Sequence, residues 1–285
     1  MALSEQRLQV NGLEWFYREA KPLRDNPDRP PVVLLHGLVT QSYSWREVMP
    51  AIAEQGFWAI APDWIGHGFS SRPEKRDFAY TAEAFVKALE AFLAELSVDR
   101  MHLVVQGFLG AYGLLYALRN PQQIERLVIV NTPLGVEAKL PGALRRMTLP
   151  LAGEMMTQDP LLVDRTLEGG GPYQVNDEDL DVYRRPFLTT SAAGRALLTT
   201  LRNFKLGPTT EEIAKELKQW QPMTLLIWGT ADPWLPKTLA ETWVTNLPHG
   251  ELSTLEQVGH YAQEDWAEKV IEVMVPFLRR ADISK

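Results

Sequence analysis

Along most of the chain, short continuous apolar runs alternate with longer segments whose apolar residues recur at helical spacing. A run that is apolar on both faces is typical of a strand buried within a parallel sheet. These runs predict strands at 32–35, 57–61, 101–105, 126–130, 223–228 and 251–255. The periodic segments predict helices at 46–55, 81–96 (with Thr81 as N-cap), 111–119, 237–247 and 264–280. Repeated strand–helix units indicate an α/β fold, a mostly parallel sheet with helices on both faces.

Two segments depart from this alternation. Residues 6–18 alternate loosely between apolar and polar, and the Asn11-Gly12 pair in their middle predicts a β-hairpin. Between 134 and 210 the strand pattern stops and the chain becomes helix-like and rich in loops. We therefore expect a core formed by residues 1–133 and 211–285, and a helical cap inserted at 134–210.

Distinctive residues follow four of the predicted strands, namely His36-Gly37-Leu38, Gln106-Gly107-Phe108, Asp232 and His260. Because sites in open α/β sheets form at the carboxyl ends of the strands, we expect these residues to lie close together. A tight strand-to-helix turn, then an acid, then a histidine is also the chain order of the catalytic groups in α/β-hydrolases.

The chain resembles the haloalkane dehalogenase and epoxide hydrolase branch of the α/β-hydrolase superfamily, nearly from end to end. The resemblance rests on VVLLHGLVTQSYSWREVMPAIAEQGFWAIAPDWIGHGFSSRP, LVVQGFLGAYGLLYA, LLIWGTADPWLP and VGHYAQED. It implies the α/β-hydrolase fold, with a doubly wound sheet and a helical cap, and it implies neither a cofactor nor a metal. It also implies that His260 is the general base and that Asp232 orients it and stabilises its charged form.

One position departs from the family pattern. The dehalogenase elbow reads Val-Gln-Asp-Trp-Gly, whereas this chain reads Val105-Gln106-Gly107-Phe108-Leu109, which aligns Gly107 with the nucleophile. A shift of one residue would place Gln106 or Phe108 there, and neither is a nucleophile. The asparagine and tryptophan that hold the halide in dehalogenases are replaced by Leu38 and Phe108. Dehalogenation and serine-esterase catalysis by the usual mechanisms are therefore not expected.

The remaining groups still predict chemistry. The backbone N–H groups of Leu38 and Phe108 occupy the positions of the family's oxyanion hole, which side-chain changes do not remove. The His260–Asp232 dyad can deprotonate water or deprotonate a substrate directly, and the resemblance implies the second use, which is that of family members working without a covalent intermediate. We expect hydrolysis or lyase chemistry on a small, mainly apolar molecule in a pocket under the cap. The predicted pocket also contains His36, Gly37, Gln106 and Asn131, although the pattern at Asn131 favours a turn amide.

Other motifs in the sequence give less indication of function. Gly169-Gly170-Gly171 lacks the Lys-Ser/Thr and the preceding strand of a phosphate loop, and predicts a hinge or turn in the cap. His67 is interpreted as a surface loop residue. No histidine spacing indicates a metal site.

The composition of the chain limits the kinds of partner and site that we expect. A net charge of −7 argues against a nucleic-acid partner, and the absence of cysteine excludes disulfides, thiolate metal sites and a cysteine nucleophile. No apolar run is long enough to span a membrane, and the first residues lack the pattern of a signal peptide, so we expect a cytoplasmic protein. Two alternatives to catalysis stay open: a non-catalytic protein that binds an apolar small molecule, and one that binds a protein partner. The sequence predicts neither the substrate nor the oligomeric state.

Overall fold

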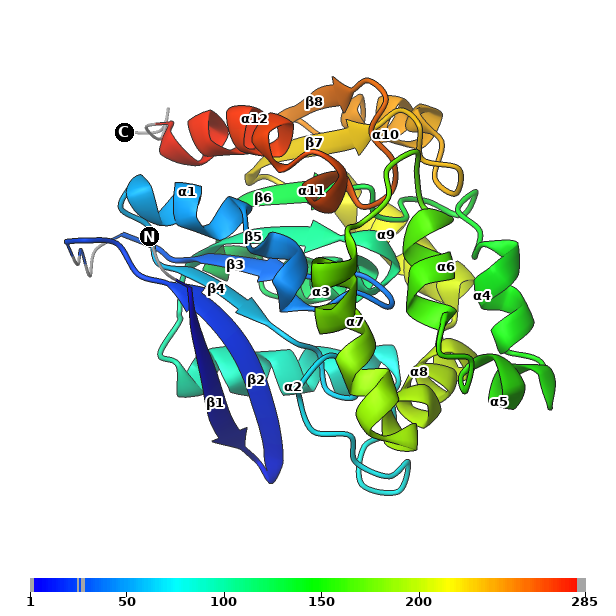
Figure 1. Ribbon diagram of the computed structural model, residues 1–285. Coiled ribbons are helices and arrows are strands. Elements are labelled where there is room, and N and C mark those ends of the chain that lie inside the picture. Colours follow the sequence, from blue (N-terminus) through cyan, green and yellow to red (C-terminus); the bar gives the residue numbers. More distant parts are fainter. Residues whose placement is uncertain (1–2, 25, 27–28, 281–285) are drawn as a thin grey trace.

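The computed structural model describes residues 3–24, 26 and 29–280, and within them eight strands form one sheet in the order β1-β2-β4-β3-β5-β6-β7-β8 (Figure 1). β3 to β8 pair in parallel, whereas β1 and β2 pair with each other, and β2 with β4, in antiparallel orientation. The strands are β1 (Ser4–Val10), β2 (Leu13–Ala20), β3 (Val32–Leu35), β4 (Ala59–Pro62), β5 (Met101–Gln106), β6 (Ile124–Val130), β7 (Met223–Gly229) and β8 (Gly250–Leu255). The predicted mixed, mostly parallel sheet is confirmed.

The hairpin expected at Asn11-Gly12 joins β1 to β2. Val10 pairs with Leu13, so the two residues between them form the turn. Asn11 and Gly12 have φ values of +51° and +79°. A two-residue hairpin turn of this kind needs positive φ at both positions, which asparagine and glycine tolerate best.

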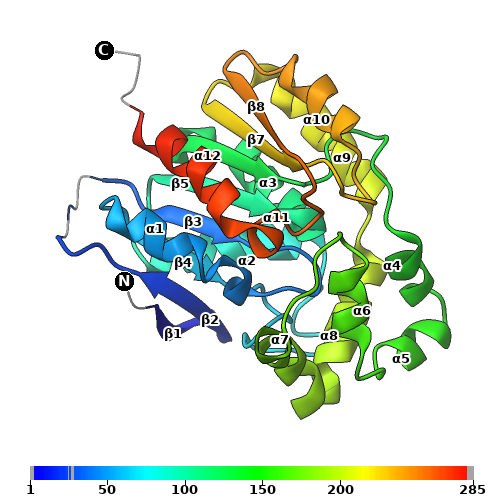
Figure 2. The same ribbon diagram turned by 45° about the horizontal axis from the view of Figure 1, so that its top comes forward.

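Helices cover both faces of the sheet (Figures 1 and 2). On one side α1 and α12 pack against each other and, with α11, against the sheet; α2, α3 and α10 cover the other side. Helices α4 to α9 come between β6 and β7 in the chain, and α4 to α8 lie beyond the carboxyl ends of the strands (Figures 1 and 2). The helices are α1 (Val48–Glu54), α2 (Ala82–Glu95), α3 (Gly107–Arg119), α4 (Gly142–Met147), α5 (Ala152–Met156), α6 (Leu162–Glu168), α7 (Asp177–Thr189), α8 (Ser191–Asn203), α9 (Leu206–Glu216), α10 (Lys237–Val244), α11 (Ala262–Asp265) and α12 (Ala267–Arg279).

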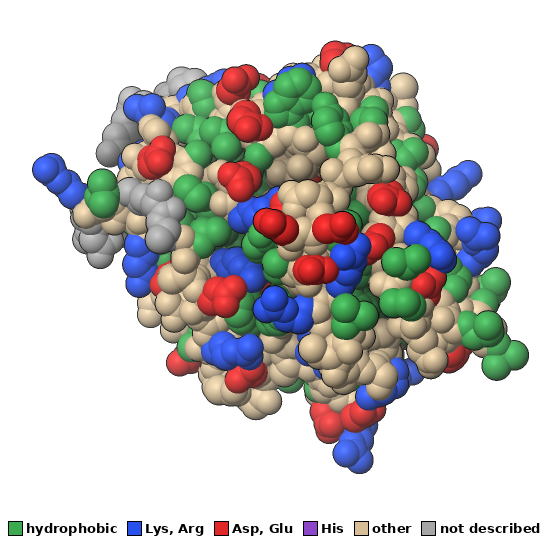
Figure 3. Space-filling view, viewed as in Figure 1, with side chains coloured by type: hydrophobic (Ala, Val, Ile, Leu, Met, Phe, Trp, Pro, Cys, Tyr) green, Lys and Arg blue, Asp and Glu red, His purple; other side chains and the backbone are tan. Residues whose placement is uncertain are grey.

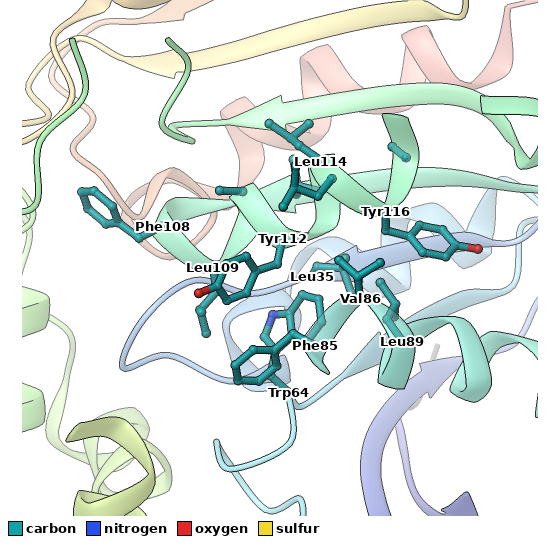
Figure 4. Close-up of a cluster of buried hydrophobic side chains, with 14 of the residues drawn as sticks. Leu35, Trp64, Phe85, Val86, Leu89, Phe108, Leu109, Tyr112, Leu114 and Tyr116 are labelled. Carbon is teal, nitrogen blue, oxygen red and sulfur yellow. The ribbon is translucent and has the colours of Figure 1, made fainter. Parts of the chain in front are cut away.

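The sheet divides the core into two apolar layers. Along β5, Leu103 and Val105 belong to the layer under α2 and α3, and Val104 between them belongs to the layer under α1 and α12. Phe85 of α2 and Tyr112 of α3 stack with ring centroids 5.2 Å apart, and Figure 4 shows them beside Trp64. Strands that are buried on both faces explain why their sequences read as continuous apolar runs.

Helix α3 begins earlier than predicted. The predicted helix at 111–119 is present, but its start is wrong, because the helix begins at Gly107, directly after β5. A Cβ on Gly110 would lie 2.9 Å from the Thr132 hydroxyl, and one on Gly113 would lie 2.7 Å from the Val105 side chain. These two glycines let the helix approach the sheet closely and do not mark a turn.

The helical insertion carries exposed apolar side chains. Leu149, Leu151 and Met155 are 52%, 78% and 75% exposed, and Figure 3 shows hydrophobic side chains projecting where Figure 1 has α4 and α5. Residue 210, the predicted end of the cap, lies within helix α9. The division into a core and a cap at 134 and 210 stays a prediction. No helix among the described residues is long and apolar enough to cross a membrane.

Candidate active site

His260 and Asp232 meet at the carboxyl edge of the sheet. Asp232 follows β7 and His260 follows β8, so their parallel pairing brings the two loops together. His260 Nδ1 lies 2.8 Å from Asp232 Oδ2, and the two side chains are 1% and 0% exposed. Because an ionised carboxylate only accepts hydrogen bonds, Nδ1 donates and Nε2 is left as the acceptor. The other carboxylate oxygen, Oδ1, accepts from the amides of Trp234 (2.8 Å) and Leu235 (3.0 Å).

Asn131, at the end of β6, contacts the acid of this pair. Its Nδ2 donates to Asp232 Oδ2 at 2.8 Å, and its Oδ1 accepts from the Gly229 amide at 2.9 Å. Asn131 also has a φ of +37°, a conformation that asparagine adopts more readily than most residues. The side chain therefore holds the carboxylate in place as well as serving the turn.

Gly107 faces the free nitrogen of His260. Its φ is +66°, and a Cβ built on it would lie 3.2 Å from His260 Nε2 and 3.1 Å from the Gly37 Cα. Among the described residues Nε2 has no hydrogen-bond partner. Glycine removes the side-chain clash that its positive φ would otherwise bring. The nitrogen thus faces a position that no side chain fills.

Gln106 joins the loop after β3 to the loop after β8. Its side-chain oxygen accepts from the Gly37 amide at 3.1 Å, and its Nε2 donates to the His260 carbonyl at 2.9 Å. Among the described residues the Leu38 amide has no hydrogen-bond partner. Phe108 is the second residue of α3, where amides have no partner within a helix. The amides of Leu38, after β3, and of Phe108, after Gly107, are thus two backbone hydrogen-bond donors on the segments next to Gly107.

Aromatic side chains enclose the histidine. The ring centroid of His260 lies 5.4 Å from that of Phe108, 4.7 Å from Trp234 and 4.9 Å from Tyr261. Phe108 was expected here for its backbone amide, whereas Trp234 and Tyr261 were not expected at the site. The available signal was their closeness in sequence, since Trp234 is two residues after Asp232 and Tyr261 directly follows His260. Three aromatic rings thus surround the imidazole of His260.

A glycine turn of the insertion holds the backbone of the histidine. The His260 amide donates to the Gly170 carbonyl at 2.7 Å, so this turn is attached to the loop after β8. The preceding amide, of Gly259, donates to Asp265 Oδ2 at 2.7 Å. Burial raises the pKa of Asp265 to about 7. Neither Gly170 nor Asp265 was expected to contact the site.

An ion-pair cluster ties helix α7 to the same region. Arg46 lies between Asp179 of α7 and Glu264 of α11, at 2.5 Å and 2.8 Å from their carboxylate oxygens. Tyr183 of α7 donates to the other oxygen of Glu264 at 2.5 Å. Burial raises the pKa of Tyr183 well above its ordinary value, so its hydroxyl stays protonated as a donor. The cluster therefore joins the insertion to the core next to the histidine loop.

The other histidines of this edge are occupied elsewhere. His36 accepts from the Trp64 amide through Nε2 at 3.1 Å, and its Nδ1 lies 2.8 Å from the Gly37 carbonyl, so its ring does not pair with the dyad. The interpretation of His67 as a surface residue is wrong: it is buried, and its Nε2 lies 3.1 Å from the Thr200 hydroxyl of α8. Within the described residues, no three His, Asp or Glu side chains form a group that could hold a metal ion.

Comparison with known proteins agrees with this architecture. The family model described as the α/β hydrolase fold matches residues 30–266. A cis-3-alkyl-4-alkyloxetan-2-one decarboxylase of Shewanella oneidensis is 29% identical over 88% of this chain and 83% of its own. A haloalkane dehalogenase of Bradyrhizobium diazoefficiens is 28% identical over 93% and 90% of the two chains. The crystal structure of a haloalkane dehalogenase from Bradyrhizobium elkani matches with a TM-score of 0.83 at 26% identity, over 97% of this chain and 98% of that one.

Proposed function

Because the chain belongs to the α/β-hydrolase fold family, we propose that it is a hydrolase or lyase for small apolar molecules, with His260 as its general base. The observation that carries the proposal is the position of Gly107. A Cβ there would lie 3.2 Å from His260 Nε2, the nitrogen that Asp232 does not bind. We infer that Gly107 stands at the family's nucleophile position. The space that it leaves is next to a basic nitrogen and is where a water or a substrate proton would be held.

In the proposed reaction the dyad acts without a covalent intermediate. Nε2 takes a proton from water, which attacks the substrate, or takes it directly from the substrate. Asp232 keeps the imidazole in the required tautomer and stabilises the imidazolium that forms. The amides of Leu38 and Phe108 stabilise the negative charge that develops on the substrate oxygen. His260 then returns the proton to the leaving group.

The substrate class follows from the surroundings. Phe108, Trp234 and Tyr261 around His260 favour a small apolar molecule with one polar reacting group. Relatives named for the conversion of haloalkanes and of an alkyl-substituted oxetanone fit the same description. We infer that the substrate is bound under the cap at 134–210, in a pocket that includes His36, Gly37, Gln106 and Asn131.

The test is turnover of p-nitrophenyl esters, epoxides, haloalkanes and an alkyl β-lactone by the native chain and by His260→Ala. We expect the variant to lose about 100- to 10,000-fold in rate, the usual contribution of a general base. Asp232→Asn is expected to lose activity for the same reason. Because the glycine at position 107 cannot act as a nucleophile, no covalent intermediate should accumulate, and we expect no burst of product in the first turnover.

Gly107→Ala separates this mechanism from a structural role of the glycine. The added methyl group fills the space beside Nε2, so turnover should fall while the dyad stays intact. The strain at positive φ costs about 1 kcal/mol, which thermal unfolding measures separately. Equal, near-background rates from the native chain and His260→Ala would contradict the proposal and favour a non-catalytic protein that binds an apolar molecule in the same pocket.

A further inference from the structure

A cavity lies at the edge of the sheet opposite the dyad. Figure 1 shows the parallel strands pointing toward the helical insertion, so their amino-terminal ends form the far edge. His102 is the second residue of β5, and Arg126 is the third residue of β6. Together with the loop before β3 and the end of α12, they line a cavity of about 410 Å³. No part of the proposed reaction uses this place.

Five arginines line the cavity, although the chain as a whole carries a net charge of −7. They are Arg29, Arg100, Arg126, Arg279 and Arg280. Among the described lining residues the single acidic one is Glu125, which pairs with Arg100, while Arg280 pairs with Glu251 outside the lining. Five guanidinium groups near these two carboxylates leave an excess of positive charge among the described residues of this region.

The arginines are held close together in spite of their like charge. Arg29 donates to the Gln55 carbonyl at 2.6 Å, and its guanidinium lies 3.7 Å from the centre of the Phe57 ring. Burial, and then the charge of Arg279, lower the pKa of Arg29. Arg126 is buried and donates to the Arg280 carbonyl at 2.6 Å. A bound anion would relieve this repulsion, because it neutralises several guanidinium groups at once.

His102 adds a second, independent observation. The residue is 3% exposed, and its Nδ1 has no hydrogen-bond partner among the described residues. Burial, and then the charges of Arg126, Arg29 and Arg100, lower its pKa to about 3, so the ring is neutral near pH 7. Buried polar atoms without a partner are rare in native proteins, and this one belongs to a side chain that lines the basic cavity, so its ring is a candidate contact for a ligand.

We propose that this cavity binds the phosphate group of a small phosphorylated molecule. Arginine forks pair well with phosphate oxygens, and here the arginines come from separate segments of the chain. Pro30, Phe57 and Leu278 supply apolar wall for the organic part of the molecule. The volume lies within the roughly 300–1,000 Å³ of small-molecule sites. The site is separate from His260 and does not depend on the proposed catalysis.

Calorimetry and thermal unfolding with phenyl phosphate and with inorganic phosphate, at constant ionic strength, test the proposal. We expect saturable binding at one site, a rise in Tm, tighter binding of phenyl phosphate, and weaker binding at higher salt. Arg29→Gln and Arg279→Gln should each weaken binding about tenfold or more, since each removes a charged hydrogen bond. Arg76→Gln is the matched control, because Arg76 is 84% exposed and does not line the cavity.

The imidazole of His102 gives a readout that a purely structural role would not move. Nitrogen-detected NMR should show its ring signals shift with phosphate, while those of the exposed His249 stay unchanged. Arg279 is exposed, so Arg279→Gln keeps the test valid even where Arg29→Gln fails to fold. Absence of saturable binding at millimolar phosphate, or equal binding by Arg279→Gln and Arg76→Gln, would overturn the proposal.

Discussion

The side chain of Gln106 connects the backbone segments that carry the proposed oxyanion donor and the proposed base. It binds the Gly37 amide, one residue before Leu38, and the carbonyl of His260. Because Gln106 is fully buried, no water replaces these bonds when the amide is removed. A residue that touches no substrate thus sets the distance between two groups of the site.

Gln106→Met keeps the volume and removes both hydrogen bonds. We expect the free energy of unfolding to fall by about 2 kcal/mol, because two buried backbone groups lose their partner. Turnover should fall further than stability explains, since His260 and Leu38 are no longer held together. Urea denaturation and steady-state kinetics measure the two effects.

Gln263→Met is the matched control. Gln263 is also buried, but its side-chain nitrogen and oxygen have no hydrogen-bond partner among the described residues. Its replacement should change stability by less than about 1 kcal/mol. Equal losses in the two variants would contradict the bridging role of Gln106.

Among the elements, α7 depends most on a few charged contacts. Most of its residues are polar, and its buried residues are Leu180, Tyr183 and Pro186. Arg46 holds it through Asp179 and through Glu264, which also accepts from Tyr183. An element with so little apolar contact relies on such a cluster for its position.

Arg46→Met should release α7. Removing one partner leaves Glu264, only 3% exposed, without its counter-charge, and we expect a loss of about 3 kcal/mol in unfolding free energy. Hydrogen exchange should rise in α7 more than in β5. Arg165→Met, which breaks a pair with a 66% exposed arginine, should cost less than about 1 kcal/mol. A uniform rise of exchange across the chain would argue against a local role.

How far the sequence predicts the structure depends on where each element finds its partners. The buried strands and the Asn11-Gly12 hairpin were predictable, because continuous apolar runs and turn residues act locally. The start of α3 was not, because Gly110 and Gly113 serve contacts with Thr132 and Val105 from other elements. His67 was misplaced for the same reason, since its partner Thr200 comes from the insertion.

The site shows the same limit. The meeting of His260 with Asp232 was expected from chain order and a family resemblance, and the distances agree with it. The contacts of Gly170 and Asp265 with the histidine loop were not, because no local pattern relates a glycine turn of the insertion to a distant loop. The roles assigned to these residues in catalysis stay predictions.

At the scale of the whole molecule, Asp265 makes stability depend on pH. Its folded pKa of about 7 lies above the ordinary value of 3.8. The folded state therefore keeps a proton that the unfolded chain releases between about pH 4 and pH 7. The free energy of unfolding falls as the pH rises through this window, because ionisation of this carboxyl group stabilises only the unfolded chain.

Asp265→Asn should remove this dependence. The amide oxygen can still accept from Gly259, so the variant should gain stability relative to the native chain as the pH rises from 4 to 8, by up to about 4 kcal/mol. Denaturation midpoints across this range measure the difference. Asp77→Asn, at a 58% exposed side chain, should follow the native profile. Parallel profiles for the native chain and Asp265→Asn would contradict the prediction.

The insertion between β6 and β7 also determines how the chain folds. Strands β1 to β6 pair within residues 4–130, and β7 pairs with β8 within 223–255. The register of Arg126 with Met223 closes a loop that contains the whole of 131–222. Forming such a contact costs chain entropy, because it closes a long loop, and contacts between residues far apart in the sequence slow folding. We therefore expect the joining of these two parts of the sheet, which also brings Asp232 and His260 to Gly107, to be a late step of folding.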